Sequence, residues 1–279
     1  MLKNKSGKII VWIVIIVVII VVILAGIAAM LFYKNNSNKV ENTNNNEAVL
    51  ESQNGEEIFV KGSAKGVDEW NISFSNEEYN TYNGEKLVSK NVRNVPTIEN
   101  ASNKEAATKI QESLIKLSDE NWEEVKKASD EYKNVESSET LGVIYLTTME
   151  NRTDNYITFK FTQSGGFGGV SWNDIKYYMY NLKSGEMVEL KDITSDYEQL
   201  VDKLYNIAEN YLETEKLGTA ENWKDKLKDI ITESGNYGLL TDKLQIVLPK
   251  YSVSAGASGV IQIDADYGKL GNLIKEECK

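Results

Sequence analysis

Apolar residues are concentrated in one uninterrupted run near the N-terminus, where residues 9–33 contain no charged side chain. Isoleucine, valine and leucine fill all sides of this run, so it lacks the polar stripe of a surface helix. About 20 helical residues, each rising about 1.5 Å, cross a hydrocarbon core of about 30 Å. Trp12 and Tyr33 stand near the two ends, where amphipathic rings meet the headgroups. We therefore predict a single transmembrane helix at residues 9–33.

The charges beside this run predict its orientation. Lys3, Lys5 and Lys8 precede it without any acidic residue, and positively charged flanks stay in the cytoplasm. Residues 1–8 are then a cytoplasmic tail, and the rest of the chain lies outside the cell membrane. A cleavable signal peptide is the alternative, with residues 26–28 (Gly-Ile-Ala) as the cleavage site, but a signal core is typically about 7 to 15 residues long. We favour an uncleaved single-pass anchor.

Residues 34–55 are rich in asparagine and contain few apolar side chains. Such a segment cannot bury enough apolar surface to offset the entropy that it would lose on ordering. We predict a linker that holds a folded exterior part away from the membrane.

The pattern changes near residue 56, where short apolar stretches indicate strands. The candidate strands are residues 57–60, 70–74 and 86–89. Asn83-Gly84 is a hairpin-turn signal, and residues 95–98 should be extended because the residue before a proline avoids the helical region. A capping box of Ser102 and Glu105 then precedes a long amphipathic helix. Residues 56–135 form the first predicted α+β unit.

Residues 136–279 continue with a mixture of alternating and helical patterns. Strands are predicted at residues 157–161, 175–179, 187–190, 244–248 and 261–263. A second capping box, Ser195 with Glu198, precedes a helix at residues 200–211, and a further helix at residues 223–231 ends at Gly235. Strands and helices mix without strict alternation, so we predict the α+β class, with antiparallel sheets that are each covered by amphipathic helices.

Charge is distributed unevenly along the chain, whose net charge is -11. All 42 acidic residues and 28 of the 31 basic residues follow the apolar run, so the exterior part carries -14. This charge argues against binding of nucleic acid or anionic lipid. It suits a cationic partner, although a soluble acidic surface is the simpler explanation.

The residues present exclude the common catalytic groupings. There is no histidine, which removes Ser-His-Asp and Cys-His arrangements and the commonest metal ligand. The single cysteine, Cys278, can form no internal disulfide, and we expect an inert thiol. Adjacent acids such as Glu123-Glu124 fit a solvated helix face, residues 264–268 lack the closing acid of a calcium loop, and residues 162–169 lack the Gly-Lys-Ser/Thr of a phosphate loop. We therefore predict no enzyme activity, no cofactor and no metal.

Two segments between predicted strands combine aromatic and small residues. The first contains Gly165, Gly166 and Phe167, with Trp172 nearby. It fits either a tight strand connection or an aromatic loop that contacts a ligand. The second is the segment at residues 249–256, which fits either a bulged hairpin or a second ligand-contacting loop.

These segments in this order resemble a known family. Residues from about 140 to 275 are similar to the DUF3298 domain, the C-terminal part of the extracellular sensor region of RsiV-like anti-sigma factors. The resemblance is carried by Gly165-Gly166, by the hairpin at residues 180–186 with Leu-Lys-Asp-Ile at 190–193, and by residues 248–253 with Gly256. Residues 57–135 resemble its companion domain, DUF4163. We expect residues 56–135 and 136–279 to correspond to these two domains.

The resemblance implies binding rather than catalysis. RsiV-like exterior domains bind lysozyme, which is strongly cationic, while the cytoplasmic end holds a sigma factor. The resemblance therefore implies that the ligand is lysozyme or another cationic envelope protein. We expect Pro249 and Tyr251 to bind it, supported by Phe167, Trp172 and the Gly165-Gly166 pair, because aromatic residues in loops contribute contact energy at little entropic cost. The family has Ala-His where this chain has Phe167-Gly168, and a tail of eight residues is too short to hold a sigma factor.

Two alternatives stay open at this point. The first is a regulator of an envelope-stress sigma-factor pathway that is cleaved within its anchor. The second is a cell-wall protein that binds peptidoglycan, with Trp172, Tyr177 and Tyr178 stacking on sugars.

Overall fold

The computed structural model describes residues 58–60, 70–134, 140–167 and 170–279. The predicted tail, transmembrane helix and linker, residues 1–55, lie outside the described residues. Within the described ranges, no helix has the length and apolar character needed to span a membrane.

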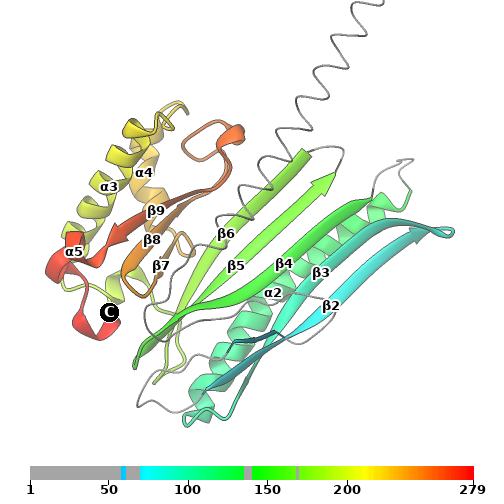
Figure 1. The fold of residues 1–279 in the computed structure, drawn as a ribbon, viewed down its shortest axis with the longest axis horizontal. Coiled ribbons are helices and arrows are strands. Elements are labelled where there is room, and N and C mark those ends of the chain that lie inside the picture. The colour runs from blue at the N-terminus through cyan, green and yellow to red at the C-terminus, as the bar shows by residue number, and fades with distance from the viewer. Residues whose placement is uncertain (1–57, 61–69, 135–139, 168–169) are drawn as a thin grey trace, which may run out of the picture. The chain divides into compact units, whose positions relative to one another are not determined.

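A six-stranded sheet with strands in the order β1 to β6 forms the larger part of the fold (Figure 1). Its strands are β1 (Ile58–Val60), β2 (Asn71–Asn83), β3 (Lys86–Glu99), β4 (Leu141–Arg152), β5 (Tyr156–Phe167) and β6 (Val170–Asn181). Neighbouring strands are antiparallel except β3 and β4, which are parallel. The prediction of antiparallel sheets is therefore wrong for this pair. A parallel pair needs a long crossover, and here the crossover contains the 29-residue helix α2 (Lys104–Tyr132).

The turn and the extended segment that the sequence predicted in the first half of the large sheet are confirmed. Gly84 has a φ of 63° in the turn between β2 and β3, and the segment around Pro96 is extended within β3.

The parallel ladder between β3 and β4 ends at the pair Arg93–Tyr145. Immediately beyond it, the Asn94 side chain accepts from the Thr147 N–H (2.6 Å) and donates to the Thr147 carbonyl (2.8 Å). A side-chain amide thus continues the connection between the two strands where the backbone ladder stops.

Helix α2 lies along one face of this sheet (Figure 1). Its apolar positions are buried against aromatic residues of the central strands, which confirms the predicted amphipathic helix. The predicted capping box is displaced by one residue, because Asn103, rather than Ser102, accepts a hydrogen bond from the Ala106 N–H (3.1 Å). The second box is displaced in the same way, since the N-cap of α3 is Asp196 rather than Ser195.

The C-terminal part adds a smaller antiparallel sheet of three strands and two long helices. Its elements are α3 (Tyr197–Thr214), α4 (Trp223–Thr232), β7 (Tyr237–Leu239), β8 (Lys243–Leu248), β9 (Ile261–Asp266) and α5 (Tyr267–Leu270). Helix α3 packs on β9 and α4 packs on β8, around a core of aliphatic side chains. The strand predicted at residues 187–190 is wrong: Met187 makes only an isolated bridge to Tyr180, and a short 3-10 helix follows at Leu190–Asp192.

Strand β6 joins the two sheets. The Tyr177 N–H donates to the Gly235 carbonyl (2.8 Å), and its hydroxyl donates to Gln245 Oε1 (2.6 Å). Ile175, Tyr177 and Val247 form a small buried cluster between the sheets. The predicted boundary between residues 135 and 136 falls within one continuous sheet, because β3 pairs with β4 across it. The DUF4163-like assignment of residues 56–135 stays a prediction.

Candidate functional site

The face of the large sheet opposite α2 is open to solvent over its central strands. Arg93 and Tyr145 both contact α2, so Val92 and Ile144, their neighbours in sequence, point to the opposite face. Val92 and Ile144 are directly paired across β3 and β4, and the next residue in the row is Ser164 of β5. The Ile144 side chain is 47% exposed, which is high for an aliphatic residue in the middle of a sheet.

A depression of about 550 Å³, which we call the sheet hollow, lies on this face. It is lined by Lys90, Val92, Thr140, Leu141, Gly142, Ile144, Ser164, Gly165, Gly166 and Asn173. Gly142 pairs directly with Gly166, so two adjacent strands lack a side chain at the same level. The bare backbone of these two glycines forms the floor of the hollow, and Val92, Leu141 and Ile144 form its apolar walls. This geometry fits an apolar group of a ligand.

The glycine-rich segment that the sequence singled out is strand rather than loop. Residues 162–167 belong to β5 and pair with both β4 and β6. Gly165 lies opposite Trp172, and Phe167 lies opposite Val170. The aromatic-loop interpretation is therefore wrong over these residues, whereas the tight strand connection is confirmed, since β5 and β6 stay paired as far as Phe167 and Val170. Gly165 and Gly166 nevertheless line the sheet hollow.

The second predicted segment forms a loop, residues 249–259, which we call the Tyr251 loop. The Pro249 carbonyl accepts from the Ser252 N–H (3.0 Å) and hydroxyl (2.6 Å), which closes a turn. Tyr251 has a φ of 69°, a conformation that is strained for a bulky residue, and its side chain is 69% exposed. Its ring lies against Gly256, where any side chain would collide with it. Lys250 Nζ lies 5.2 Å from the ring centroid.

The structure brings the two predicted segments to the same side of the molecule. A Cβ atom built on Gly259, at the end of the Tyr251 loop, would lie 3.9 Å from Asn173 Oδ1, and Asn173 lines the sheet hollow. Val260 packs against the buried cluster that contains Ile175. The hollow and the base of the loop are therefore neighbours, although the residues that form them are at least 76 positions apart in sequence, from Asn173 to Pro249.

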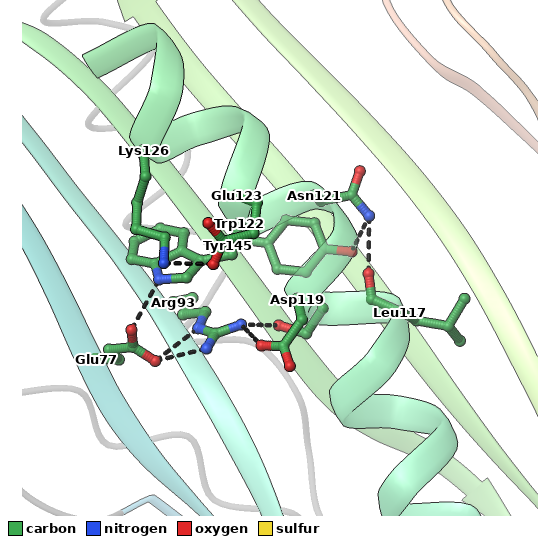
Figure 2. A network of polar contacts seen from close by, with 10 residues as sticks. Glu77, Arg93, Leu117, Asp119, Asn121, Trp122, Glu123, Lys126 and Tyr145 are labelled. Atoms are coloured by element: carbon green, nitrogen blue, oxygen red, sulfur yellow. Dashed lines mark hydrogen bonds and ion pairs between the residues drawn. The ribbon is translucent and has the colours of Figure 1, made fainter. Parts of the chain in front are cut away.

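The opposite face carries a polar network that sequence reasoning missed (Figure 2). Arg93 is 8% exposed and donates to Glu77 Oε2 from Nε (2.8 Å) and Nη2 (2.6 Å), and to Asp119 Oδ1 from Nη1 (2.6 Å). Its guanidinium lies 5.3 Å from the Trp122 ring, and the Trp122 indole N–H donates to Glu77 Oε1 (2.9 Å). Partial burial raises the pKa of Glu77, but the bonds from Arg93 and Trp122 outweigh it and leave that pKa below its ordinary value. The network joins β2, β3 and α2.

Other residues that the sequence analysis considered as candidates are buried or hydrogen-bonded within the fold. Cys278 is buried, and burial raises the pKa of its thiol. Asp264 accepts from Lys243 (2.8 Å) and Gln245 (2.7 Å) on the neighbouring strand. Tyr177 is 2% exposed, so its ring offers no free face for stacking on a sugar, whereas Tyr178 is only partly buried against the core under α2. The sugar-stacking role is therefore wrong for Tyr177 and stays a prediction for Tyr178.

Comparison with known proteins gives a likeness of fold. No family model and no curated protein matches the sequence. A DUF3298 family structure from Bacteroides fragilis superimposes with a TM-score of 0.52 at 13% identity, covering 76% of this chain and 96% of that one. A DUF3298 family structure from Pseudomonas aeruginosa gives 0.52 at 12% identity, covering 76% and 97%. This chain therefore contains a DUF3298-like fold.

Proposed function

We propose that this protein is a membrane-anchored, extracytoplasmic binding module of the RsiV-like type, and that its ligand is lysozyme or another cationic envelope protein. The observation that carries this proposal is the sheet hollow beside the base of the Tyr251 loop, on a DUF3298-like fold. The anchor is the apolar run at residues 9–33, with the N-terminus in the cytoplasm.

The surface has the two kinds of feature that protein recognition uses. Tyr251 is a protruding aromatic residue whose backbone is held by the turn at Pro249, so it would lose little entropy on binding. The sheet hollow provides a nearby apolar recess for a side chain of the partner. Burying one such side chain contributes about 1.5–3 kcal/mol, or roughly 10- to 150-fold in affinity.

The acidic character of the chain favours a cationic partner. A net charge of -14 after the apolar run attracts a cationic protein over a distance and raises the association rate. This contribution is screened by salt, with a Debye length of about 8 Å at physiological ionic strength. Weaker binding at higher salt, mainly through slower association, is therefore expected.

Titration of lysozyme against residues 56–279 at low and at physiological salt tests the proposal. The absence of binding at about 50 μM in low salt, which corresponds to less than about 6 kcal/mol of binding free energy, would contradict lysozyme as the ligand. Tyr251→Ala should raise the Kd at least about tenfold. Tyr82→Ala, which truncates a 49% exposed tyrosine near the β2–β3 turn, is the matched control and should leave the Kd unchanged.

A second pair of variants tests the sheet hollow. A Cβ atom on Gly142 has its nearest neighbour at 3.7 Å, so Gly142→Leu fills the hollow without displacing the backbone. It should weaken binding by about 10-fold or more if a partner side chain enters the hollow. Gly268→Leu makes the same change in α5, where a Cβ atom meets no neighbour within 4 Å, and should have no effect. A pull-down with purified peptidoglycan distinguishes a protein ligand from a glycan.

A further inference from the structure

Strand β9 has an open edge, and a hydrogen bond just beyond the end of the strand shows which of its backbone N–H and C=O groups point away from β8. The Tyr267 N–H donates to the Asp242 carbonyl (3.1 Å), and these residues continue the β8–β9 register by one step. Bonded and non-bonded pairs alternate along an antiparallel ladder, so Ile263 bonds to β8. Gln262 and Asp264 lie at the alternate positions, and their N–H and C=O groups therefore point away from β8.

The other edge of β8 follows the same alternation. The Val247 N–H donates to the Asn236 carbonyl (2.7 Å) on the side of β7. The adjacent residue, Ile246, must then direct its backbone groups toward β9, where its register partner is Ile263. Two independent hydrogen bonds thus give the same assignment for the outer edge of β9.

A depression of about 720 Å³ runs between this edge and helix α3, and we call it the β9 groove. Three consecutive strand residues, Gln262, Ile263 and Asp264, line it. Ile263 is 2% exposed and its side chain points into the core, so the groove is in contact with the main chain of the strand as well as with its side chains. β9 is an edge strand of the three-stranded sheet, and α3 packs against it (Figure 1).

The opposite wall of the groove is one side of α3. Ile207 and Tyr211 are one turn apart, about 6 Å along the helix axis, which is close to the roughly 6.7 Å between alternate residues of an extended strand. Lys203 stands one turn earlier and makes no ion pair with any residue of the described ranges. Asn206 and Asn210 lie beside them, and neither side chain is hydrogen-bonded within the part of the chain that the structure describes.

Asp264, the charged residue of β9 that lines the groove, is also held within its own sheet. Edge strands are commonly guarded by charged side chains that repel an added strand. Here the Asp264 carboxylate is turned across its own sheet, where Lys243 and Gln245 both donate to it. The outer edge thus keeps two N–H and two C=O groups accessible.

We propose that the β9 groove binds an extended peptide segment of a partner protein, which adds to β9 as a fourth strand. The backbone of the peptide bonds to the N–H and C=O groups of Gln262 and Asp264. Alternate side chains face α3, with an apolar residue over Ile207 and Tyr211 and an acidic residue beside Lys203. This site is separate from the sheet hollow and does not depend on the function proposed for it.

The experiment uses the full chain in detergent micelles and a phage library of random eight-residue peptides. Selection on the parent chain is compared with selection on Gln262→Pro. Proline removes the outward N–H of Gln262 and leaves the β8–β9 ladder intact, because this N–H does not bond to β8. Gln262→Ala keeps the N–H and removes only the carboxamide, so it is the matched control. Asn210→Trp, which fills the groove from an exposed helix position, replaces the proline variant if that variant fails to fold.

Selection on the parent chain should enrich peptides that have alternating apolar residues and one acidic residue, and selection on Gln262→Pro should not. The synthesised consensus peptide should slow amide exchange at Gln262 and Asp264 by at least about tenfold. Its Kd should rise at least about tenfold in Gln262→Pro, about threefold or more in Lys203→Glu, and less than about twofold in Gln262→Ala.

Three results would overturn the proposal. The first is that no peptide is enriched over the Gln262→Pro chain. The second is an equal loss of binding in Gln262→Ala, which would indicate recognition by the carboxamide rather than by the strand edge. The third is a dimer of the parent chain that Gln262→Pro dissociates, which would make a second copy the occupant of the groove.

Discussion

Replacing Arg93 by methionine removes the positive charge that joins β2, β3 and α2 (Figure 2). The guanidinium makes three bonds to the carboxylates of Glu77 and Asp119 and a longer one to the Ser118 hydroxyl (3.3 Å). Methionine has a similar apolar length and fills the space over Trp122. The substitution therefore isolates the polar contribution of the network.

The magnitude follows from the exposure of the partners. Losing one member of a fully buried ion pair costs about 3–5 kcal/mol. The side chains of Glu77 and Asp119 are 45% and 50% exposed, so water can solvate both carboxylates after the substitution. The Trp122 indole also continues to donate to Glu77. We therefore expect the free energy of unfolding to fall by about 2–3 kcal/mol.

The same variant should change the pH dependence of stability. The pKa of Glu77 is below its ordinary value of 4.5 in the folded chain, with hydrogen bonding to Arg93 as the largest lowering contribution. A carboxylate with a lowered folded pKa stabilises the fold above its unfolded pKa, and this stabilisation is lost as pH falls through the folded pKa. The parent chain should therefore lose more stability than Arg93→Met when the pH is lowered from above 4.5 to below it.

Urea unfolding of residues 56–279, followed by tryptophan fluorescence and far-UV circular dichroism, measures both effects. Arg93→Lys keeps the charge but not the planar fork, and should give an intermediate loss. Lys126→Met, which removes the ion pair with Glu123 on the surface of α2, is the control and should cost less than about 1 kcal/mol. A change below about 0.5 kcal/mol for Arg93→Met would refute the view that this network stabilises the fold.

Three further substitutions or treatments have defined outcomes. Gly185→Ala should lower the free energy of unfolding by at least about 2 kcal/mol, because Gly185 has a φ of 75° and an added Cβ atom would lie 2.8 Å from the backbone of α2. Gly84→Ala is the control: Gly84 has a φ of 63° but open space around it, so this variant should cost only about 1 kcal/mol. Asn94→Ala should cost about 2 kcal/mol in urea unfolding by leaving both backbone groups of Thr147 without their partner. Cys278 should react with a thiol reagent at pH 8 only at the rate of local unfolding, and fast labelling of the folded chain would contradict its burial.

The sequence predicted those elements whose signal lies within a few neighbouring residues. The amphipathic helix α2, the turn at Gly84 and the extended segment at Pro96 follow from side-chain periodicity and from backbone preference. Cap positions were displaced by one residue at both helices, because Ser, Asn and Asp compete for the same backbone N–H groups. Strand β4 was missed, since Gly142 and several polar residues interrupt its apolar alternation.

The candidate site required the tertiary structure. The sequence singled out Gly165 and Gly166, but the sheet hollow forms only because Gly142, on another strand, stands beside Gly166 in register. The Arg93 network was equally hidden, because its carboxylates come from β2 and from α2. The open edge of β9 depends on strand order, which no local pattern encodes. The helices and turns of this chain are thus determined by preferences between residues close in sequence. Which side chains share a surface is determined by the pairing of distant strands, because that pairing depends on the burial of the whole core.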